Sequence, residues 1–389
     1  MKWETMKLSD CCNSIADGDH QPPPKANQGV PFVTIANINS YNEFDFSNTM
    51  FVPEEYYQNL ASKRKAQKGD VLYSVVGSFG IPVLIKDNKP FVFQRHIAIL
   101  RPNKKILSSF LYYTMLSKDF YSKADAVALG AAQRTISLTS LRNIEIQVPT
   151  VQFQHKVVDI LSAYDNLIEN KQKQIKLLEE AAQRLYKEWF VDLRFPGHET
   201  IPIVDGVPEG WKRKKLIDIA DIQYGYAFDG SLFSTDKNGT PIVRIRNIPT
   251  GNTNDYTSEV ADNQYLVYNG DIVVGMDGEF HINTWCGKTA YLVQRTCRIK
   301  PKQENVNGWL LQAIYSPIKY YEKTIVGATV AHLGKKHLDA IEILIGTDDL
   351  FVPFQILYLK RQKLLNQINK LSEARDRLLP KLMNGEIEV

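Results

Sequence analysis

The sequence predicts a mixed α/β (α+β) chain built as a tandem duplication, in which an α/β globular segment followed by one long helix occurs twice. Three observations support this prediction. Two long stretches, one central and one C-terminal, repeat apolar residues at alternating spacings of three and four. Each follows a segment of short β-branched runs separated by turn residues. The two globular segments also match one another, piece by piece and in the same order.

The central stretch, residues 152–195, contains no proline or glycine ahead of residue 196 and is rich in strong helix formers. Its apolar stepping predicts a helix from Lys156 to Trp189, roughly 50 Å long at about 1.5 Å per residue. The stepping positions are Tyr164, Ile168, Lys171, Ile175, Leu178, Ala182, Leu185 and Trp189. A helix of this length with one narrow apolar stripe needs a partner helix; the alternative is a helix buried in an ordinary core.

The C-terminal stretch, residues 354–383, repeats the same stepping and is the expected partner. Its positions are Leu357, Arg361, Leu364, Ile368, Leu371, Arg375, Leu378 and Leu382. The two stretches align without a gap, so that Ile175 matches Ile368. Pro380 should end or kink this helix, and Gly385 suits its C-terminal cap.

In the first globular segment, β-branched runs predict strands at residues 30–38, 71–76 and 97–100. Helical spacing of apolar residues predicts a helix over residues 108–123, with Ser108 or Ser109 as its N-cap. Residues 194–211 then form an ordered linker rich in proline and glycine.

The second globular segment repeats the first from Trp211 onward. The matching pairs of ranges are 30–38 with 240–248, 68–79 with 269–280, 91–102 with 291–301, and 130–146 with 327–343. The predicted domain boundaries are residues 1–150, 151–195 (first long helix), 196–210 (linker), 211–348 and 349–389 (second long helix).

Composition restricts the function classes. The chain has 389 residues and a formal net charge of +4, which permits nucleic-acid binding without demonstrating it. No apolar run reaches the length of a membrane span, and no signal peptide opens the sequence. The four cysteines lack metal-ligand spacing, which favours free thiols in a reducing cytoplasm. We therefore expect a cytoplasmic protein without a structural metal.

A search for catalytic motifs finds none that is complete. The Gly287-Lys288-Thr289 sequence lacks the earlier glycine of a phosphate-binding loop, because Ile282 stands in its place. No G-x-G-x-x-G, G-x-S-x-G or H-E-x-x-H sequence occurs. The carboxylate-histidine group around His20 has no counterpart in the second copy. We expect no active site and no bound cofactor in this chain.

Loops after the predicted strands instead combine glycine, aromatic, amide and basic residues in both copies. Arg and Gln suit guanine and adenine edges, Asp and Glu can accept from cytosine, and basic residues neutralise phosphates. The alternative for each residue is a solvated loop or turn side chain. The candidates for contacting DNA in the first copy are Asp19, His20, Lys25, Ser78, Phe79, Arg95, His96, Gln133 and Arg134. Those in the second are Tyr224, Tyr226, Asp277, Glu279, His281, Arg295, Thr329, His332 and Lys335.

Among these loops, Gln94-Arg95 and Gln294-Arg295 recur most closely. Identical residues in copies that read different sequences fit phosphate contacts or structural roles. The loops that differ between the copies are the better candidates for specificity.

Several sequences together resemble one family in the right order. The helix end and linker carry LYKEWFVDLRFPGHE (185–199) and VDGVPEGW (204–211), and the C-terminus carries RDRLLPKLMNGEI (375–387). DGDHQPP (17–23) and GVPFVTIANI (29–38) stand in the first copy, and YGYAF (224–228), PIVRIRNI (241–248) and GMDGEF (275–280) in the second. Over essentially its whole length, the chain resembles the specificity (S) subunit of type I restriction-modification enzymes.

The resemblance implies two target recognition domains, each reading one half of a split site in double-stranded DNA. It implies that the two long helices, which the family conserves, pair antiparallel as a spacer and dock two methyltransferase subunits. Those partners would bind S-adenosylmethionine and methylate adenine, and restriction/translocation subunits would join them. The specificity subunit itself would be non-catalytic and bind no membrane.

Three alternatives remain open. The chain would be the specificity subunit of a combined restriction-modification enzyme if the methyltransferase and the nuclease share one partner chain. It would be a coiled-coil scaffold if no sequence-dependent DNA binding occurs, or a self-contained enzyme if it modifies DNA alone.

Bulky residues outside the helical seam predict a second buried face, for docking partners or for packing on the chain's own domains. They are Leu161, Leu167, Leu177, Tyr186, Phe190, Tyr358, Leu365 and Leu379.

Overall fold

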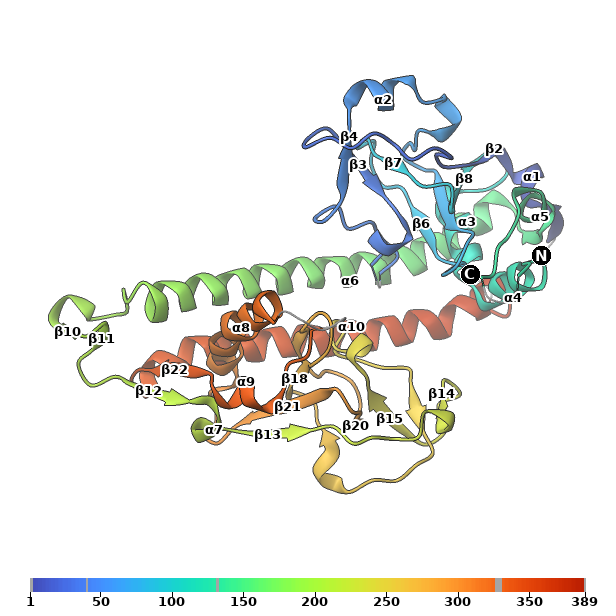
Figure 1. Cartoon of the computed structure of the whole chain (residues 1–389). Coiled ribbons are helices and arrows are strands. Elements are labelled where there is room, and N and C mark those ends of the chain that lie inside the picture. The colour runs from blue at the N-terminus through green and yellow to red at the C-terminus, as the bar shows by residue number, and fades with distance from the viewer. Residues whose placement is uncertain (1–2, 40, 131–132, 326–330, 388–389) are drawn as a thin grey trace. The chain divides into compact units, whose positions relative to one another are not determined.

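The fold was analysed in a computed structural model of the chain. It describes residues 3–39, 41–130, 133–325 and 331–387. The chain divides into two compact units, Met1–Asn166 with Ser372–Val389 and Leu167–Leu371. The two long helices, α6 (Val151–Tyr186) and α10 (Val352–Met383), each contribute to both units (Figure 1). The units thus divide both helices, and the predicted domain boundaries remain predictions.

The first unit is built on a four-stranded antiparallel sheet and two smaller sheets (Figure 1). The large sheet has the order β2 (Cys12–Asp17), β8 (Ile97–Pro102), β5 (Val71–Ser74), β6 (Pro82–Leu84). The smaller sheets are β4 (Met50–Val52), β3 (Val30–Val33), β7 (Val92–Phe93), and the pair β1 (Glu4–Lys7) with β9 (Glu145–Val148). Strands β3 and β7 are parallel, and the other paired strands are antiparallel.

Strand β5 shows why a continuous apolar run forms the centre of this sheet. Val71 and Tyr73 pack into the core that contains the helices, whereas Leu72 packs into a second core against the smaller sheet. Side chains on a strand alternate between its two faces, so a strand that is covered on both faces needs apolar residues throughout. All four residues of β5 are accordingly buried.

The helices of the first unit differ in detail from the prediction. They are α1 (Leu8–Cys11), α2 (Glu54–Asn59), α3 (Ser108–Leu116), α4 (Lys118–Ala126) and α5 (Leu138–Asn143). The single helix predicted over 108–123 is two helices, because the Ser117 hydroxyl accepts the Phe120 N–H at 3.2 Å and starts α4. Ser108 is not the N-cap of α3. Leu107 holds that position, and its N–H donates to Gln154 of α6 at 2.8 Å.

The second unit repeats this plan. Its large antiparallel sheet is β13 (Ala220–Tyr224), β21 (Thr296–Pro301), β18 (Ile272–Gly275), β19 (Ile282–Thr284). Its second sheet is β14 (Phe233–Ser234), β16 (Tyr256–Thr257), β15 (Thr240–Val243), β20 (Ala290–Leu292), β17 (Leu266–Val267). The remaining elements are the pair β12 (Lys212–Lys215) with β22 (Glu342–Ile345), the hairpin β10 (Ile203–Val204) with β11 (Val207–Pro208), and the helices α7 (Leu216–Ile219), α8 (Asn307–Thr324) and α9 (Lys335–Asp339). The order of the large sheet matches that of the first unit strand for strand, as the duplication predicts.

Within the second unit, α6 and α10 pair antiparallel. Along α6, Lys171 donates to Gln367 at 2.8 Å, and eight residues later Glu179 accepts from Arg361 at 2.6 Å. The partner number falls as the number on α6 rises, which defines the direction. A buried cluster of Ile168, Ile175 and Ile368 forms the apolar part of the seam. Lys171, the polar interruption of the predicted stripe, is therefore satisfied across the pair.

In the first unit the same two helices are joined by a polar network. The Tyr113 hydroxyl of α3 donates to Asp165 of α6 at 2.6 Å, and Arg375 of α10 donates to the other Asp165 oxygen at 2.7 Å. Leu379 and Leu382 of α10 are buried in the core of this unit. Pro380 lies inside α10, three residues before it ends, and Gly385 beyond its end has a φ of +70°. This conformation is the one that favours glycine at a helix C-terminus.

The predicted second face of the long helices is mostly used inside the chain. Leu161, Phe190, Tyr358 and Leu379 are buried, and Leu365 packs on the isoleucine cluster of the seam. Leu167 and Leu177 are instead exposed, at 51% and 65%. For the buried members the structure favours the second alternative, packing on the chain's own domains. Tyr186 also packs inside the chain, where it stacks on Phe190 with ring centroids 5.2 Å apart. Leu167 and Leu177 are the residues of that set that another chain can still reach.

Candidate nucleic-acid interface

The loops singled out in the sequence rest on a backbone framework that is the same in both copies. After β2, the Gly18 N–H donates to the Ile97 carbonyl at 3.1 Å, and after β13 the Gly225 N–H donates to the Thr296 carbonyl at 2.9 Å. A Cβ at Gly18 would lie 2.3 Å from the Phe93 oxygen, closer than any side chain tolerates. Glycine is required there by close approach of two backbones.

The turn before β8 and the turn before β21 are structurally equivalent. The sequence match, however, pairs their residues one position out of register. The Val75 N–H donates to His96 at 2.8 Å, and the corresponding Met276 N–H donates to Arg295 at 2.9 Å. His96 therefore occupies the place of Arg295. The recurrence of Gln-Arg in the two copies is offset by one residue, so Arg95 corresponds to Gln294. The expectation that these residues share a phosphate or structural role loses its basis, and this turn carries different side chains in the two copies.

A third pair of loops completes the framework. Val76 forms a β-bridge with Thr135 in the first copy, and Asp277 forms the equivalent bridge with His332 in the second. The hairpin β5–β6 and the segment before α5 thus lie side by side, as do the hairpin β18–β19 and the segment before α9. Loops far apart in the sequence form one surface at the same end of each large sheet.

In the first copy, this surface carries a basic and aromatic group. Arg134 donates to the Asp125 carboxylate at 2.7 Å and to the Asp125 carbonyl, which holds its guanidinium near the end of α4. Phe79 stacks on Tyr121, with ring centroids 5.4 Å apart and planes within 7°. Ser78 and Gln133 are exposed beside them. The stacked pair offers an apolar platform next to a cation.

Asp19, predicted as a residue that contacts DNA, instead makes hydrogen bonds within the protein. The Asp19 side chain is 8% exposed and accepts the hydroxyl of Tyr56, and its carbonyl accepts the Arg95 N–H at 3.0 Å. Burial and the Asp19 carboxylate raise the pKa of Tyr56 to about 12, so the phenol keeps its proton. We therefore reassign Asp19 from base contact to positioning of its loop. The neighbouring His20 is exposed and lies 2.6 Å from Asp17.

Arg95 and His96 present different charges. Arg95 is exposed, whereas His96 is half-buried. Burial and, secondarily, the positive charge of Arg95 lower the pKa of His96, so its imidazole is neutral at pH 7. The equivalent position in the second copy holds the permanent cation Arg295.

In the second copy, Arg295, Asp277 and His332 lie within hydrogen-bond or ion-pair distance of one another. Glu279 is exposed on the same hairpin, 3.6 Å from the His281 imidazole. Tyr226 is exposed and packs against Phe228 and Tyr265. The structure therefore brings most predicted residues of this copy onto the loop surface.

Tyr224 and Lys335 of the second copy and Lys25 of the first lie elsewhere than in the loops described above. Tyr224 packs on the core with a buried hydroxyl, and burial raises its pKa to about 12, which makes it a structural residue. Lys335 is exposed on α9 and pairs with Asp339 at 2.7 Å. Lys25 is exposed in the segment before β3. Thr329 lies outside the described residues.

Sequence reasoning missed the partners that hold these loops. Tyr56 and Arg64 come from the segment after β4, and Arg64 lies 3.7 Å from Asp17. Tyr121 supports the Phe79 ring from α4, and Tyr265 contacts Tyr226. No sequence motif surrounds these residues, because their relation to the loops is purely tertiary. Only the aromatic content of each segment hinted at them.

The described residues were compared with the arrangements that hold metal ions or reactive thiols. No group of three or more His, Cys, Asp or Glu residues among them is arranged to hold a metal ion. All four cysteines are free and buried, and burial raises the pKa of Cys297 to about 12, so that thiol is unreactive at neutral pH. Within the same residues, every helix is too short or too polar to cross a bilayer.

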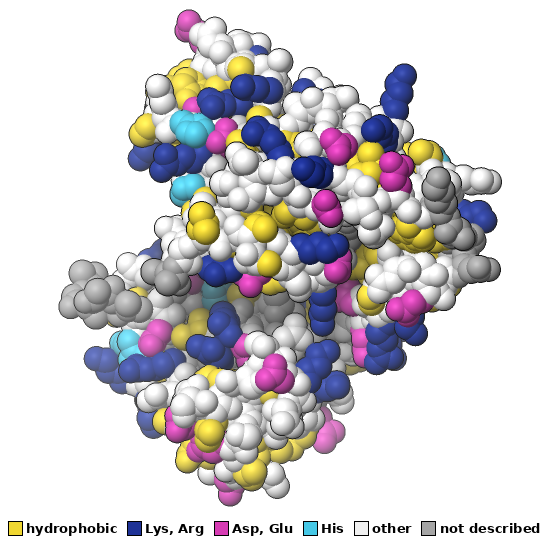
Figure 2. All heavy atoms as spheres, turned by 90° about the vertical axis from the view of Figure 1, so that its right-hand side faces the viewer, with side chains coloured by type: hydrophobic (Ala, Val, Ile, Leu, Met, Phe, Trp, Pro, Cys, Tyr) yellow, Lys and Arg dark blue, Asp and Glu magenta, His cyan; other side chains and the backbone are white. Residues whose placement is uncertain are grey.

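Charge on the surface is mixed. Figure 2 shows Lys and Arg side chains interspersed with Asp and Glu on the face that it displays, without one continuous basic field. The net charge of +4 agrees with this distribution. Non-specific attraction to phosphate is therefore modest, and particular loop residues have to supply recognition.

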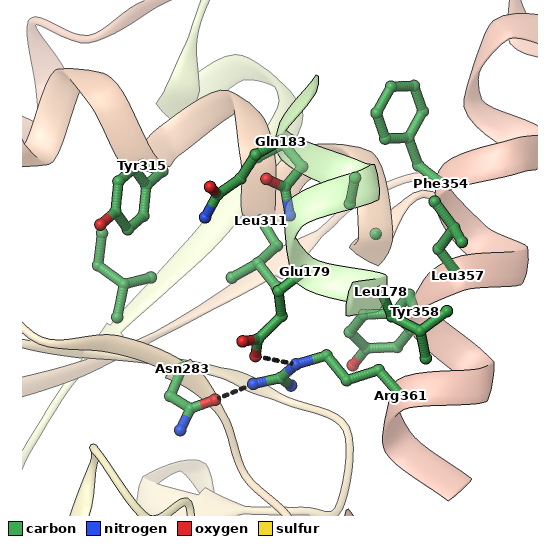
Figure 3. Close-up of a pocket in the computed structure, with 14 residues that line it drawn as sticks. Leu178, Glu179, Gln183, Asn283, Leu311, Tyr315, Phe354, Leu357, Tyr358 and Arg361 are labelled. Atoms are coloured by element: carbon green, nitrogen blue, oxygen red, sulfur yellow. Dashed lines mark hydrogen bonds and ion pairs between the residues drawn. The ribbon is translucent and has the colours of Figure 1, made fainter. Parts of the chain in front are cut away.

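A cavity of about 230 Å³ lies in the second unit where α6 and α10 meet α8 and β19 (Figure 3). The Arg361 guanidinium of α10 lines it and donates to Glu179 of α6 at 2.6 Å, to Thr284 at 2.6 Å and to Asn283 at 2.7 Å. Asn283 and Thr284 belong to β19, so one side chain ties the recognition fold of this unit to both helices. Arg361 thus uses its hydrogen bonds to attach β19 to the two helices, and we assign this site the role of positioning the sheet on the helices.

Replacing Arg361 by alanine should lower the unfolding free energy of the second unit by about 2 kcal/mol, because hydrogen bonds from a charged group are lost at a mostly buried site. Lys173→Ala is the control, on α6 within the same unit. Its largely exposed pair with Glu169 should contribute under about 0.5 kcal/mol. Urea denaturation followed by tryptophan fluorescence reports on this unit, which contains Trp189, Trp211, Trp285 and Trp309. Equal shifts for the two variants would contradict the assigned role.

Comparison with known proteins agrees with this picture. The sequence profile described as the type I restriction modification DNA specificity domain matches residues 1–180 and 208–346. Over its full length, the chain is 25% identical to the type I restriction enzyme MjaIX specificity subunit of Methanocaldococcus jannaschii and covers 94% of that protein. It is 34% identical to the EcoBI specificity subunit of Escherichia coli over 34% of this chain and 28% of that one.

A solved structure shares the fold. The chain superposes on the S subunit of a type I restriction-modification system from M. genitalium with a TM-score of 0.53 at 17% sequence identity. The match covers 98% of this chain and 96% of that one. At this identity the likeness establishes the architecture, and the loop residues have to be interpreted from their own geometry.

Proposed function

Because the chain belongs to the type I restriction modification DNA specificity family, it is a non-catalytic DNA-recognition subunit, and we propose that it reads a split target in double-stranded DNA. Each globular copy would read one half of the target through the loops at the end of its large sheet. The two halves would differ in sequence, since the equivalent loop positions carry different side chains.

The observation that carries this proposal is the repeated framework with unequal side chains. The same backbone hydrogen bonds hold the turn of His96 and the turn of Arg295, yet one position is a neutral imidazole and the other a cation. Likewise, Val76 and Thr135 in the first copy are replaced by Asp277 and His332 in the second. A fold that keeps these backbone hydrogen bonds and varies its surface chemistry suits two domains that read different sequences.

The proposal includes partner subunits. A modification or restriction reaction needs catalytic subunits, which we propose are two methyltransferase subunits and associated restriction/translocation subunits. S-adenosylmethionine would bind the methyltransferases, where adenine is methylated. The two long helices leave several large apolar residues exposed, among them Leu167 and Leu177 on α6 and Ile356 and Leu359 on α10. These residues support docking of partners along the helices.

Sequencing that detects methylated bases, applied to cells expressing the chain with its methyltransferase partner, tests the proposal. We expect methylation at one sequence composed of two short defined halves separated by unspecified base pairs. The chain expressed alone should give no methylation, and so should the partner alone. Methyl transfer by the purified chain without its partner would contradict the non-catalytic assignment, and a single undivided target would contradict the split reading.

A further inference from the structure

Arg295 occupies an unusual backbone conformation at the candidate interface. Its φ is +71°, in the left-handed region that residues with a side chain rarely adopt. Its carbonyl accepts the Met276 N–H at 2.9 Å, and the next N–H, from Thr296, donates to the Val293 carbonyl at 3.2 Å. The equivalent His96 makes the same two hydrogen bonds without a positive φ, so the left-handed conformation is particular to Arg295. Strained residues that persist in folded proteins concentrate at functional sites. The exposed side chain of Arg295 thus projects from a turn with a left-handed backbone conformation.

Two further side chains hold the Arg295 guanidinium. Its Nε lies 3.4 Å from Asp277 Oδ2, and its Nη1 lies 3.1 Å from His332 Nδ1. His332 Nδ1 is also 2.5 Å from Asp277 Oδ1, a separation that requires a proton between the two atoms. That nitrogen therefore donates to Asp277, and the Arg295 contact with it is packing and not a second hydrogen bond. Both Nη groups keep donors for an outside acceptor.

The first copy shows that the fold does not need this triad. The positions equivalent to Asp277, His332 and Arg295 hold Val76, Thr135 and His96, with the same β-bridge and backbone hydrogen bond. No carboxylate stands at that place in the first copy. The triad is accordingly an addition to the surface of the second copy and not part of its structural framework.

The charges around Arg295 favour a base over a phosphate. Asp277 offsets the charge of the guanidinium, and Glu279 adds a second carboxylate on the same hairpin, 65% exposed in its side chain. An anionic phosphate gains little from a nearly neutral or acidic cluster. A fixed guanidinium with two outward N–H groups instead matches guanine O6 and N7 in the major groove, and a carboxylate can accept from the cytosine N4 amine.

We infer that Arg295 reads the guanine of a G·C pair in the half-site of the second globular copy, with Asp277 and His332 as positioning residues. The inference rests on the proposed function. It predicts that the Arg295 guanidinium donates two hydrogen bonds to O6 and N7 of one guanine of the target.

The test is methylated-base sequencing of the full complex with wild-type chain, Arg295→Ala and Asp277→Asn. Arg295→Ala should reduce discrimination at one G·C position of one half-site by roughly 5- to 160-fold, the range for a bidentate base contact. The other positions and the other half-site should keep their preferences. Asp277→Asn should weaken the preference at that same position while guanine remains preferred, an effect that a purely structural change would not confine to one base pair.

Matched variants separate the outcomes. His96→Ala, at the equivalent place in the first copy, should leave the Arg295 position unchanged. Arg295→Lys keeps the charge and loses the bidentate fork, so it should relax the same position even if Arg295→Ala fails to fold. A uniform fall in methylation with unchanged base preferences would overturn the inference and identify a phosphate contact, as would relaxation at an A·T position. A wild-type target without two halves would refute the proposed function itself.

Discussion

Replacing Leu177 and Leu359 together by aspartate should abolish co-purification of the chain with the proposed methyltransferase subunits and leave its folding unchanged. Leu177 of α6 is 65% exposed and Leu359 of α10 is 56% exposed, so neither contributes much to the core of the second unit. A carboxylate forced into an apolar interface costs several kcal/mol, and every 1.4 kcal/mol weakens binding about tenfold. Two such substitutions should take the complex below detection.

The control is Val260→Asp, which places the same charge at an apolar residue that is 84% exposed and belongs to neither long helix. It should co-purify like the wild type. Thermal unfolding of each variant alone should match the unmodified chain, which separates lost docking from lost folding. Leu365 is unsuited to this test, since it packs against the seam and aspartate there would part the two helices. Undiminished co-purification of the double variant would exclude docking through these residues.

The duplication and the helical seam could be predicted because both depend on local periodicity. Ile175 and Ile368 match in the sequence and lie in one cluster in the fold. Element boundaries were less predictable where tertiary contacts decide them. Gln154 of α6 satisfies the start of α3 in place of a serine cap, and Ser117 interrupts a stretch that has continuous helical spacing.

The use of apolar helix residues outside the seam could not be predicted from spacing alone. Leu161 and Leu177 look alike in the sequence, yet the first is fully buried in the core of the first unit and the second is exposed. A heptad pattern identifies which residues face the partner helix. It gives no information on what covers the remaining faces, because globular segments distant in the sequence do so.

The candidate interface was predicted at the level of loops and not of residues. Turn chemistry located the loop segments, because Gly18 and Gly225 are required by close backbone approach. The roles within them depend on neighbours from other segments. Asp19 is buried beside Tyr56, and Arg295 corresponds to His96 although the sequences align it with Arg95. Matching the two Gln-Arg dipeptides in the sequence shifts the pairing by one residue, and the backbone hydrogen bonds of the two turns correct it.

The central claim is that each globular copy reads its own half of a split DNA target. The most direct test exchanges residues 211–347 for the corresponding segment of a relative with a different target, within the full chain and with the methyltransferase partner present. Methylated-base sequencing should then show one half of the target replaced by the relative's and the other half unchanged. A change in both halves, or in neither, would contradict the claim.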